Sequence, residues 1–211
     1  MKLVWSPETA SKAYIQTVKW CGVNGESGVA ELVAAMAAGW KAQMIVETWS
    51  EGGVMGTSVG LAVARVHTGG RHVCVVPDER SRGEYAERMG EAGMSAEMVV
   101  GEAEEVMEGL VGIDFMVVDS RHANFSRVLR VAKLGTKGAV LVCNNANNAP
   151  SAFRWRTLLE ARSRRLLRSV FLPVGKGLDI AHVSAIGPSA ANTWIKHLDQ
   201  QSGELHLIRR R

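Results

Sequence analysis

The sequence of 211 residues lacks long apolar runs. No stretch approaches the about 18 consecutive apolar residues of a membrane-spanning helix. The first residues, MKLVWSPETASK, contain no continuous apolar segment of the kind found in a secretory signal peptide. We therefore expect a soluble intracellular protein without a membrane partner. The sequence leaves both the cytoplasm and the nucleus open as its location.

Cysteine is scarce, with three residues in the chain. The odd number argues against a framework of disulfides, and two of the three lie inside apolar runs, Cys74 in HVCVV and Cys143 in VLVCN. We expect buried free thiols. The sequence has no CxxC pair and no Cys/His cluster, so it gives no indication of a zinc site.

Two nucleotide-binding motifs are also missing. Without GxGxxG a dinucleotide-dependent dehydrogenase is disfavoured, and without GxxxxGK[ST] a P-loop is excluded. Residues 56–60, GTSVG, do match the GxSxG pattern of a nucleophile elbow. That elbow requires its serine directly after a buried strand, and the preceding SEGGVM is no such strand, so Ser58 is expected inside a helix.

The chain instead alternates short β-branched runs with segments of helical period. Apolar residues at 59, 62, 63 and 66, and again at 125, 128, 129 and 132, follow the spacing of a helix. Two further helices precede the first run, the earlier one starting at Ser6-Pro7. The pattern predicts βαβ units and a mostly parallel sheet. Its predicted parallel strands are residues 44–48, 72–76, 97–100, 113–118 and 139–143.

The pattern changes after the fifth predicted strand. Residues 150–168 are expected to form one helix, followed by a strand at 169–174, a turn at Gly175-Lys176-Gly177 and a strand at 178–185. So short a turn implies an antiparallel pair. We expect one domain, with N-terminal helices in 1–40, a core in 41–186 and a final hairpin in 187–211, formed by residues 194–198 and 204–208.

Charge is distributed unevenly along the chain. Residues 1–149 contain 14 Lys and Arg against 17 Asp and Glu, a net charge of −3, whereas residues 150–211 contain 11 against 4, a net charge of +7. Six arginines lie in residues 154–168. A cationic surface of this kind attracts nucleic acid or another polyanion without reading its sequence. The alternative is an ordinary solvated face whose arginine stems cover apolar surface.

Acidic or polar residues follow almost every predicted parallel strand. In open parallel sheets ligands bind outside the carboxyl ends of the strands, where the strand order reverses. Carboxylates there accept hydrogen bonds from hydroxyl and amino groups, as in a ribose or an adenine. The competing interpretation is that they cap the following helices. The residues concerned are Glu47, Asp78, Glu79, Glu102, Asp119 and the pair Asn144-Asn145.

The runs IDFMVVDSRHANFSRVLRVAKLGTKGAVLVCNNA, residues 113–146, and PVGKGLDIAHVSA, residues 173–185, resemble class I S-adenosylmethionine-dependent methyltransferases. The similarity covers roughly residues 25–186 and is greatest to the catechol and caffeoyl-CoA O-methyltransferase group. The whole chain also resembles a plant family labelled methyltransferase-like. The resemblance implies a Rossmann-like α/β fold: a seven-stranded, mostly parallel sheet with an antiparallel last pair and helices on both faces.

The resemblance also implies a site for S-adenosylmethionine. Glu47 and the nearby Gly53 correspond to the family's first strand end and glycine turn, beside the amino-acid part of the cofactor. Asp78 and Glu79 correspond to the acid that holds the ribose, and Glu102 to the acid on the adenine side. Asp119 corresponds to the aspartate that binds a divalent metal in the O-methyltransferases, and it would orient the methyl acceptor. His122 lies at the position of the family's catalytic base.

The chain departs from the family's pattern at three places. Bulky Trp49 and a late Gly52-Gly53 pair replace the short glycine turn, Asn144 replaces a metal-binding Asp, and His122 replaces the lysine base. Hard cations favour anionic oxygen ligands, so we expect no divalent metal. Two functions stay open: a methyltransferase acting on a small hydroxylated molecule, and an inactive binding or scaffold protein, with an anionic partner on the basic C-terminal helix.

Overall fold

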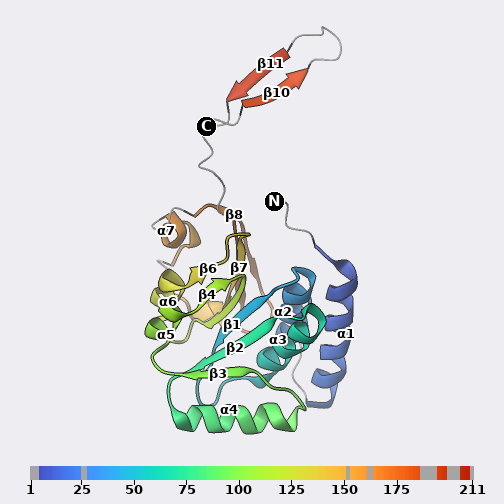
Figure 1. Ribbon diagram of the computed structural model, residues 1–211, viewed down its shortest axis with the longest axis vertical. Coiled ribbons are helices and arrows are strands. Elements are labelled where there is room, and N and C mark those ends of the chain that lie inside the picture. The colour runs from blue at the N-terminus through green and yellow to red at the C-terminus, as the bar shows by residue number, and fades with distance from the viewer. Residues whose placement is uncertain are drawn as a thin grey trace.

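The computed structural model describes residues 5–24, 28–150, 153–160, 164–185, 194–198 and 205–209. One seven-stranded sheet forms the centre of the fold (Figure 1). Its spatial order is β3 (Glu97–Val100), β2 (Arg71–Val76), β1 (Met44–Thr48), β5 (Phe115–Asp119), β7 (Ala139–Asn144), β9 (Leu178–Val183) and β8 (Leu166–Leu172).

The sheet is parallel from β3 to β7, and β9 runs antiparallel to both of its neighbours, β7 and β8. The predicted mostly parallel sheet with an antiparallel last pair is therefore confirmed. The strand order reverses between β1 and β5, which lie side by side although β2 and β3 come between them in the chain. This switch point is where an open α/β sheet leaves a crevice for a ligand.

Helices cover both faces of the sheet. One face packs against α2 (Val29–Gly39), α3 (Met55–Thr68) and α4 (Glu79–Glu91), with α1 (Pro7–Asn24) lying outside α2 and α3. The other face carries α5 (Ala103–Gly109), α6 (Phe125–Val131) and α7 (Trp155–Glu160) (Figure 1). Successive strand residues face opposite layers. Ile45 accordingly packs in the first apolar cluster and Val46 in the second.

Three smaller expectations are confirmed: the start of the first helix, the place of Ser58 and the burial of the cysteines. Helix α1 begins at Pro7, and the carbonyl of Ser6 accepts the N–H of Ala10 at 3.2 Å. Ser58 lies inside α3 and not at an elbow. The cysteines Cys21, Cys74 and Cys143 are free and buried. Within the described ranges, no helix combines the length and the apolar character needed to cross a bilayer.

The predicted strand 113–118 is wrong as one element. The chain forms β4 (Val111–Ile113), which pairs with β6 (Lys133–Leu134) in a small separate sheet, and then β5. Asp114 separates the two strands, because its carboxylate accepts the backbone N–H groups of Gln43 at 2.8 Å and Met44 at 3.0 Å. A short polar side chain that bonds the backbone in this way competes with the ladder of a strand.

The predicted helix 150–168 is also wrong. After a turn of 3₁₀ helix, η1 (Ala146–Asn148), the residues of this range that the structure describes are helical only in Trp155–Glu160, and β8 begins at Leu166. Arg164 donates to the carbonyls of Leu134, Gly135 and Ser184, at distances of 2.9 to 3.3 Å. Residues from Leu166 onward form a strand because they pair with β9, although their sequence pattern is helical. The six arginines are therefore not on one helix, and the single basic helix face expected for a polyanion does not exist.

The predicted C-terminal hairpin is confirmed, with a boundary shifted by one residue. Strand β10 (Trp194–Leu198) pairs antiparallel with β11 (Leu205–Arg209) in a sheet of their own.

Substitution of Asp114 by Ala should reduce the free energy of unfolding by about 2 to 3 kcal/mol, because two backbone N–H groups lose their acceptor. Asp114→Asn keeps one acceptor oxygen and should lose less. Urea unfolding followed by circular dichroism measures both changes. Val170→Ala on the exposed edge strand β8 serves as the control and should change stability by less than about 0.5 kcal/mol. A fully stable Asp114→Ala protein would contradict this account of the break between β4 and β5.

Candidate functional site at the switch point of the sheet

Two adjoining cavities open at the carboxyl edge of the sheet, between the ends of β1 and β5; together we call them the switch-point cleft. The larger contains about 540 Å³ of space, including its open mouth, and the other about 410 Å³. Both are lined by Thr48, Trp49, Ser50, Asp119 and His122; the larger adds Val75, Val76, Pro77, Gly101, Glu102, Ala103, Asn124, Phe125 and Val128.

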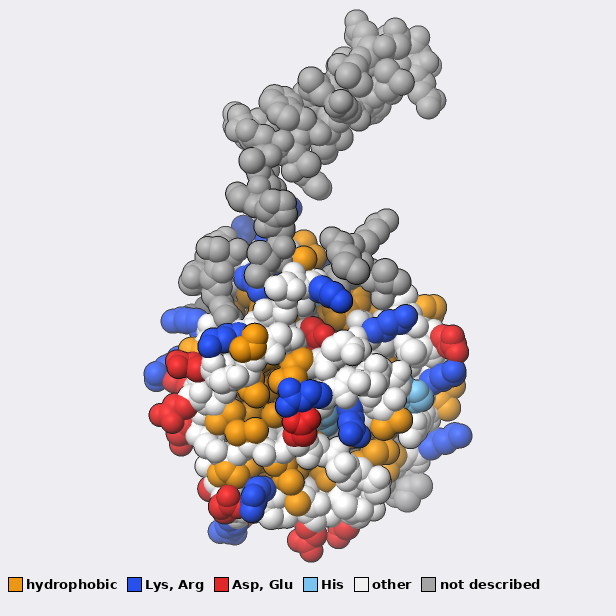
Figure 2. Space-filling model, viewed as in Figure 1, with side chains coloured by type: hydrophobic (Ala, Val, Ile, Leu, Met, Phe, Trp, Pro, Cys, Tyr) orange, Lys and Arg blue, Asp and Glu red, His pale blue; other side chains and the backbone are white. Residues whose placement is uncertain are grey.

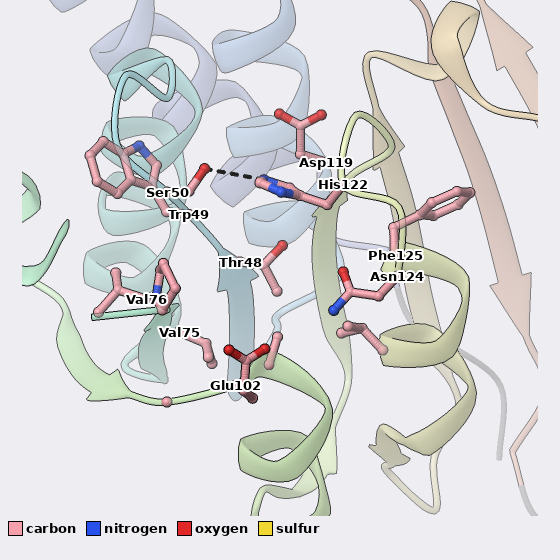
Figure 3. A pocket seen from close by; sticks show the side chains of 14 residues that line it. Thr48, Trp49, Ser50, Val75, Val76, Glu102, Asp119, His122, Asn124 and Phe125 are labelled. Carbon is pink, nitrogen blue, oxygen red and sulfur yellow. Dashed lines mark hydrogen bonds between the residues drawn. The ribbon is translucent and has the colours of Figure 1, made fainter.

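The cleft brings together residues from the ends of five strands, β1, β2, β3, β5 and β7. Figure 3 shows His122, Asn124 and Phe125 on one side of it and Trp49 and Ser50 on the other. Of the predicted site residues, Glu102, Asp119 and His122 line the larger cavity, while Glu47 and Gly53 line the smaller one. Glu102 is exposed at the start of α5 and makes no side-chain cap to that helix. Its carboxylate is therefore free to accept a hydrogen bond from a ligand.

Asp78 and Glu79 lie at the start of α4 and line neither cavity of the cleft. The Asp78 carboxylate accepts the N–H of Ser81 at 2.7 Å, and this bond lowers the pKa of Asp78. Glu79 forms an ion pair with Arg82 at 2.7 Å. The chain places these acids in the capping role. Pro77, the residue before them, is the one that lines the cleft.

Glu47 is almost fully buried at the end of β1, with 3% of its surface exposed. Its Oε1 accepts hydrogen bonds from Tyr85 Oη at 2.7 Å and from His72 Nε2 at 2.9 Å, and its Oε2 accepts one from Ser58 Oγ at 2.9 Å. Burial and the adjacent carboxylate raise the pKa of Tyr85, so its hydroxyl stays protonated and donates. Both oxygens of Glu47 are thus satisfied by the protein itself.

The loop after β1 is shaped by Trp49. The Trp49 indole is buried and meets the Tyr85 ring edge-on, with centroids 5.3 Å apart. A Cβ at Gly53 would lie 2.5 Å from Trp49 Nε1, so this position requires glycine to make room for the indole. Arg88 donates to the carbonyl of Gly53 at 3.0 Å. Gly53 is therefore needed for the packing of Trp49. The indole occupies the space inside this loop, so that space is not open to a ligand in the smaller cavity.

Ser50 was missed by sequence reasoning. Its Oγ lies 3.2 Å from Nε2 of His122, the interaction drawn as a dashed line in Figure 3. The backbone N–H of His122 donates to the carbonyl of Asp119 at 3.2 Å, which fixes the turn that carries the ring. The imidazole is held at the wall of the cleft with one nitrogen directed toward the serine hydroxyl. No sequence pattern marks Ser50, since it is defined only by its distance from a residue 72 positions away.

Asp119 is paired with Arg121. Its Oδ2 accepts Nε of Arg121 at 2.8 Å and Nη2 at 2.5 Å, and its Oδ1 accepts the backbone N–H of the same residue at 2.9 Å. Burial alone would raise the pKa of Asp119, but these bonds outweigh it and lower the pKa. The carboxylate is ionised and already neutralised by a guanidinium.

The residues at this place do not fit a divalent metal. Asp119 has both oxygens bonded to Arg121, and Asn144 contributes no charge and accepts the backbone N–H of Asn145 at 2.8 Å. The described residues contain no group of three His, Cys, Asp or Glu side chains arranged as metal ligands. Hard cations need several anionic or carbonyl oxygens that are free to coordinate.

S-adenosylmethionine fits only part of the site. The free carboxylate of Glu102 and the apolar wall of Val75, Val76 and Pro77 suit an adenosine group in the larger cavity. The first-strand acid does not suit the amino group of the cofactor as well, because Glu47 is bonded to three protein donors. The adenosine end of the cleft is therefore the better fit.

Solved methyltransferases share this fold. A methyltransferase from Geobacter sulfurreducens is 20% identical, with a TM-score of 0.59 over 81% of this chain and 88% of that one. The O-methyltransferase TomG from Streptomyces achromogenes, solved with SAM, is 22% identical, with a TM-score of 0.53 over 82% and 90% of the two chains. An O-methyltransferase from Bacillus cereus in complex with SAH is 14% identical, with a TM-score of 0.51 over 82% and 90%. These similarities confirm the expected Rossmann-like methyltransferase fold.

Sequence comparison gives a family without an activity attached. No curated protein matches the chain. The model of the family described as "Protein of unknown function (DUF1442)" matches residues 1–210, and the chain belongs to that family.

Proposed function

We propose that the protein binds S-adenosylmethionine in the switch-point cleft and transfers its methyl group to the hydroxyl of a small molecule. The observation that carries this proposal is the cleft itself. It lies at the strand-order reversal of a methyltransferase-type sheet and combines a free carboxylate, Glu102, with a positioned imidazole, His122. The solved structures of this fold that contain SAM or SAH support the choice of cofactor.

Each residue has a role that follows from its position. Glu102 would accept hydrogen bonds from the adenosine part, against the apolar residues that end β2. When bound, the cofactor supplies an electrophilic methyl group. His122 Nε2 accepts the proton of the acceptor hydroxyl, which takes the place of Ser50 Oγ in the hydrogen bond. The hydroxyl oxygen would form the new bond to the methyl carbon as its proton passes to the imidazole, while the bond from that carbon to the cofactor's sulfur would break and leave S-adenosylhomocysteine. Asp119 holds Arg121, which lines the smaller cavity beside His122.

The second candidate is a binding or scaffold protein that has kept the fold and lost the chemistry. Two observations favour it: the protein's own donors engage Glu47, and Trp49 fills the loop after β1. The basic C-terminal third could still attract nucleic acid or another polyanion by its charge, although its described arginines are divided between the residues just before α7, α7 itself, the residues just before β8, and β8. Such binding would weaken steeply with salt, because it depends on counterion release.

Cofactor binding is tested by isothermal calorimetry with S-adenosylhomocysteine and S-adenosylmethionine. The wild-type protein should bind both. Glu102→Gln should weaken binding about tenfold through loss of a charge-assisted hydrogen bond. Glu105→Gln, on the same helix but outside the cleft, is the matched control and should bind as the wild type does. A folded wild-type protein that fails to bind either ligand at millimolar concentration would contradict the cofactor site.

Catalysis is tested by incubating a metabolite extract with cofactor labelled on its methyl group and detecting labelled products by mass spectrometry. His122→Ala should reduce product formation by about 100-fold or more, the usual contribution of a general base. Its affinity for S-adenosylhomocysteine should stay within about threefold of the wild type. His67→Ala on the surface of α3 is the control. Cofactor binding without any labelled product would select the scaffold function, and full activity in His122→Ala would remove its role as base.

A further inference from the structure

A separate groove lies between α6 and α7, beside the switch-point cleft; we call it the α6–α7 groove. It contains about 620 Å³ of space, including its open mouth. Phe125 lines both this groove and the larger cavity of the cleft, so the two spaces meet at one side chain. Phe125 is therefore the wall that the groove shares with the larger cavity, which His122 also lines.

Apolar and aromatic side chains form the walls of the groove. The rings of Phe125 and Phe153 lie with centroids 5.0 Å apart at an interplanar angle of 54°, and Leu158 closes the α7 side. Phe125 and Leu158 are each 4% exposed, so they are fixed by the core behind them. Phe153 is braced in turn by Trp155, whose ring meets it edge-on at 5.0 Å. Rigid aromatic walls of this kind favour a flat, apolar ligand.

The polar residues of the groove are cationic or neutral. Arg130 from α6 and Arg154 at the start of α7 both line it, and Thr157 contributes a hydroxyl. No acidic side chain is found among the lining residues that the structure describes. Figure 2 shows apolar side chains at the surface on the side of the molecule where α6 lies in Figure 1, with both basic and acidic side chains near them. A groove with this character complements an anionic group and not a cationic one.

Arg127 provides the contrast. It lies on α6, one turn before Arg130, and forms an ion pair with Glu104 at 2.8 Å. Its charge is thus neutralised by α5, and it does not line the groove. Arg130 and Arg127 share a helix and a chemistry, but only the first faces the apolar walls.

We propose that the α6–α7 groove binds the methyl acceptor, and that this acceptor is a flat, apolar molecule carrying one anionic group, a carboxylate, sulfonate or phosphate. The inference rests on the proposed function. Phe125 and Phe153 hold the flat part, Arg130 and Arg154 bind the anionic group, and the hydroxyl to be methylated lies at the opposite end, toward His122. Selection by charge at the far end of the acceptor replaces selection by a metal, which the residues around Asp119 do not fit.

Two dyes that differ in one group test the proposal. Both 8-anilino-1-naphthalenesulfonate and N-phenyl-1-naphthylamine are flat and fluoresce in apolar surroundings, and only the first carries a sulfonate. The sulfonate dye should bind the wild-type protein more tightly than the neutral dye. Arg130→Gln combined with Arg154→Gln should weaken the sulfonate dye about tenfold, and the neutral dye less than twofold. Arg127→Gln is the matched control and should change neither.

A second variant checks the location. Thr157→Trp places a bulky ring in the groove from an exposed position on α7 and should weaken both dyes. Equal binding of the sulfonate dye to the wild type and the double arginine variant would overturn the proposal. So would an equal loss for the two dyes in that variant, since charge would then not be the selector.

Calorimetry with S-adenosylhomocysteine on the same proteins separates this proposal from the cofactor site. All three variants should bind it as the wild type does, because none of the four substituted residues lines the switch-point cleft. If the wild type fails to bind it while the dyes behave as expected, the methyltransferase function falls and the groove stands as an anion-binding site. If it binds while the dyes show no selection, the cofactor site stands and the acceptor class is wrong.

Discussion

A buried carboxylate needs hydrogen-bond donors, and the arrangement around Glu47 follows from that need. Ser58 on α3, His72 on β2 and Tyr85 on α4 each donate to it, so one side chain ties the end of β1 to three other elements. Tyr85 then provides the surface on which Trp49 packs, and Trp49 requires glycine at position 53. Loss of one donor would leave a buried carboxylate oxygen without its hydrogen bond, which costs more than the loss of a surface contact.

The same network sets the position of Ser50, whose hydroxyl contacts His122. Ser50 directly follows Trp49, and the N–H of Gly53 donates to the Ser50 carbonyl at 2.9 Å, so the serine is placed by the turn that the indole enforces. The charge of the side chains changes from acidic to basic between the larger cavity and the α6–α7 groove. Glu102 is a free acid at one end, Asp119 is neutralised by Arg121, and the α6–α7 groove is basic at its rim. A cofactor with donors at the acidic end and an acceptor with an anion at the basic end would both be oriented by this gradient.

The sequence predicted the parts of the fold that depend on burial alone. Strands β1, β2 and β7 are nearly continuous apolar runs, as strands covered on both faces must be, and α3 and α6 carry an apolar period. Elements decided by single polar contacts were not predictable. Asp114 divides one apolar run into β4 and β5 by bonding two backbone groups from a distant segment. Helix α5 has one buried residue, Met107, and so has no period to detect.

Prediction of the site had the same limits. A carboxylate at the end of a strand can cap a helix, enter the core or line an open cavity, and Asp78, Glu47 and Glu102 show these three outcomes in one chain. Position along the sequence does not separate Asp78 from Glu102, because each lies two residues after the end of its strand. The three carboxylates differ in their hydrogen-bond partners. Asp78 accepts from Ser81 three residues away, whereas Glu47 accepts from Tyr85, which only tertiary packing brings near it. The contact between Ser50 and His122 likewise exists only because the fold brings two distant segments together.

The reactivity of the buried cysteines depends on whether the central sheet is closed or open. Cys74 on β2 and Cys143 on β7 are fully buried within the central sheet, and burial raises the pKa of both thiols. A thiol reacts as its thiolate, so neither side chain can be oxidised or alkylated while the sheet is closed. Their chemical modification therefore requires the sheet to open, and the rate at which either thiol is alkylated reports on that opening.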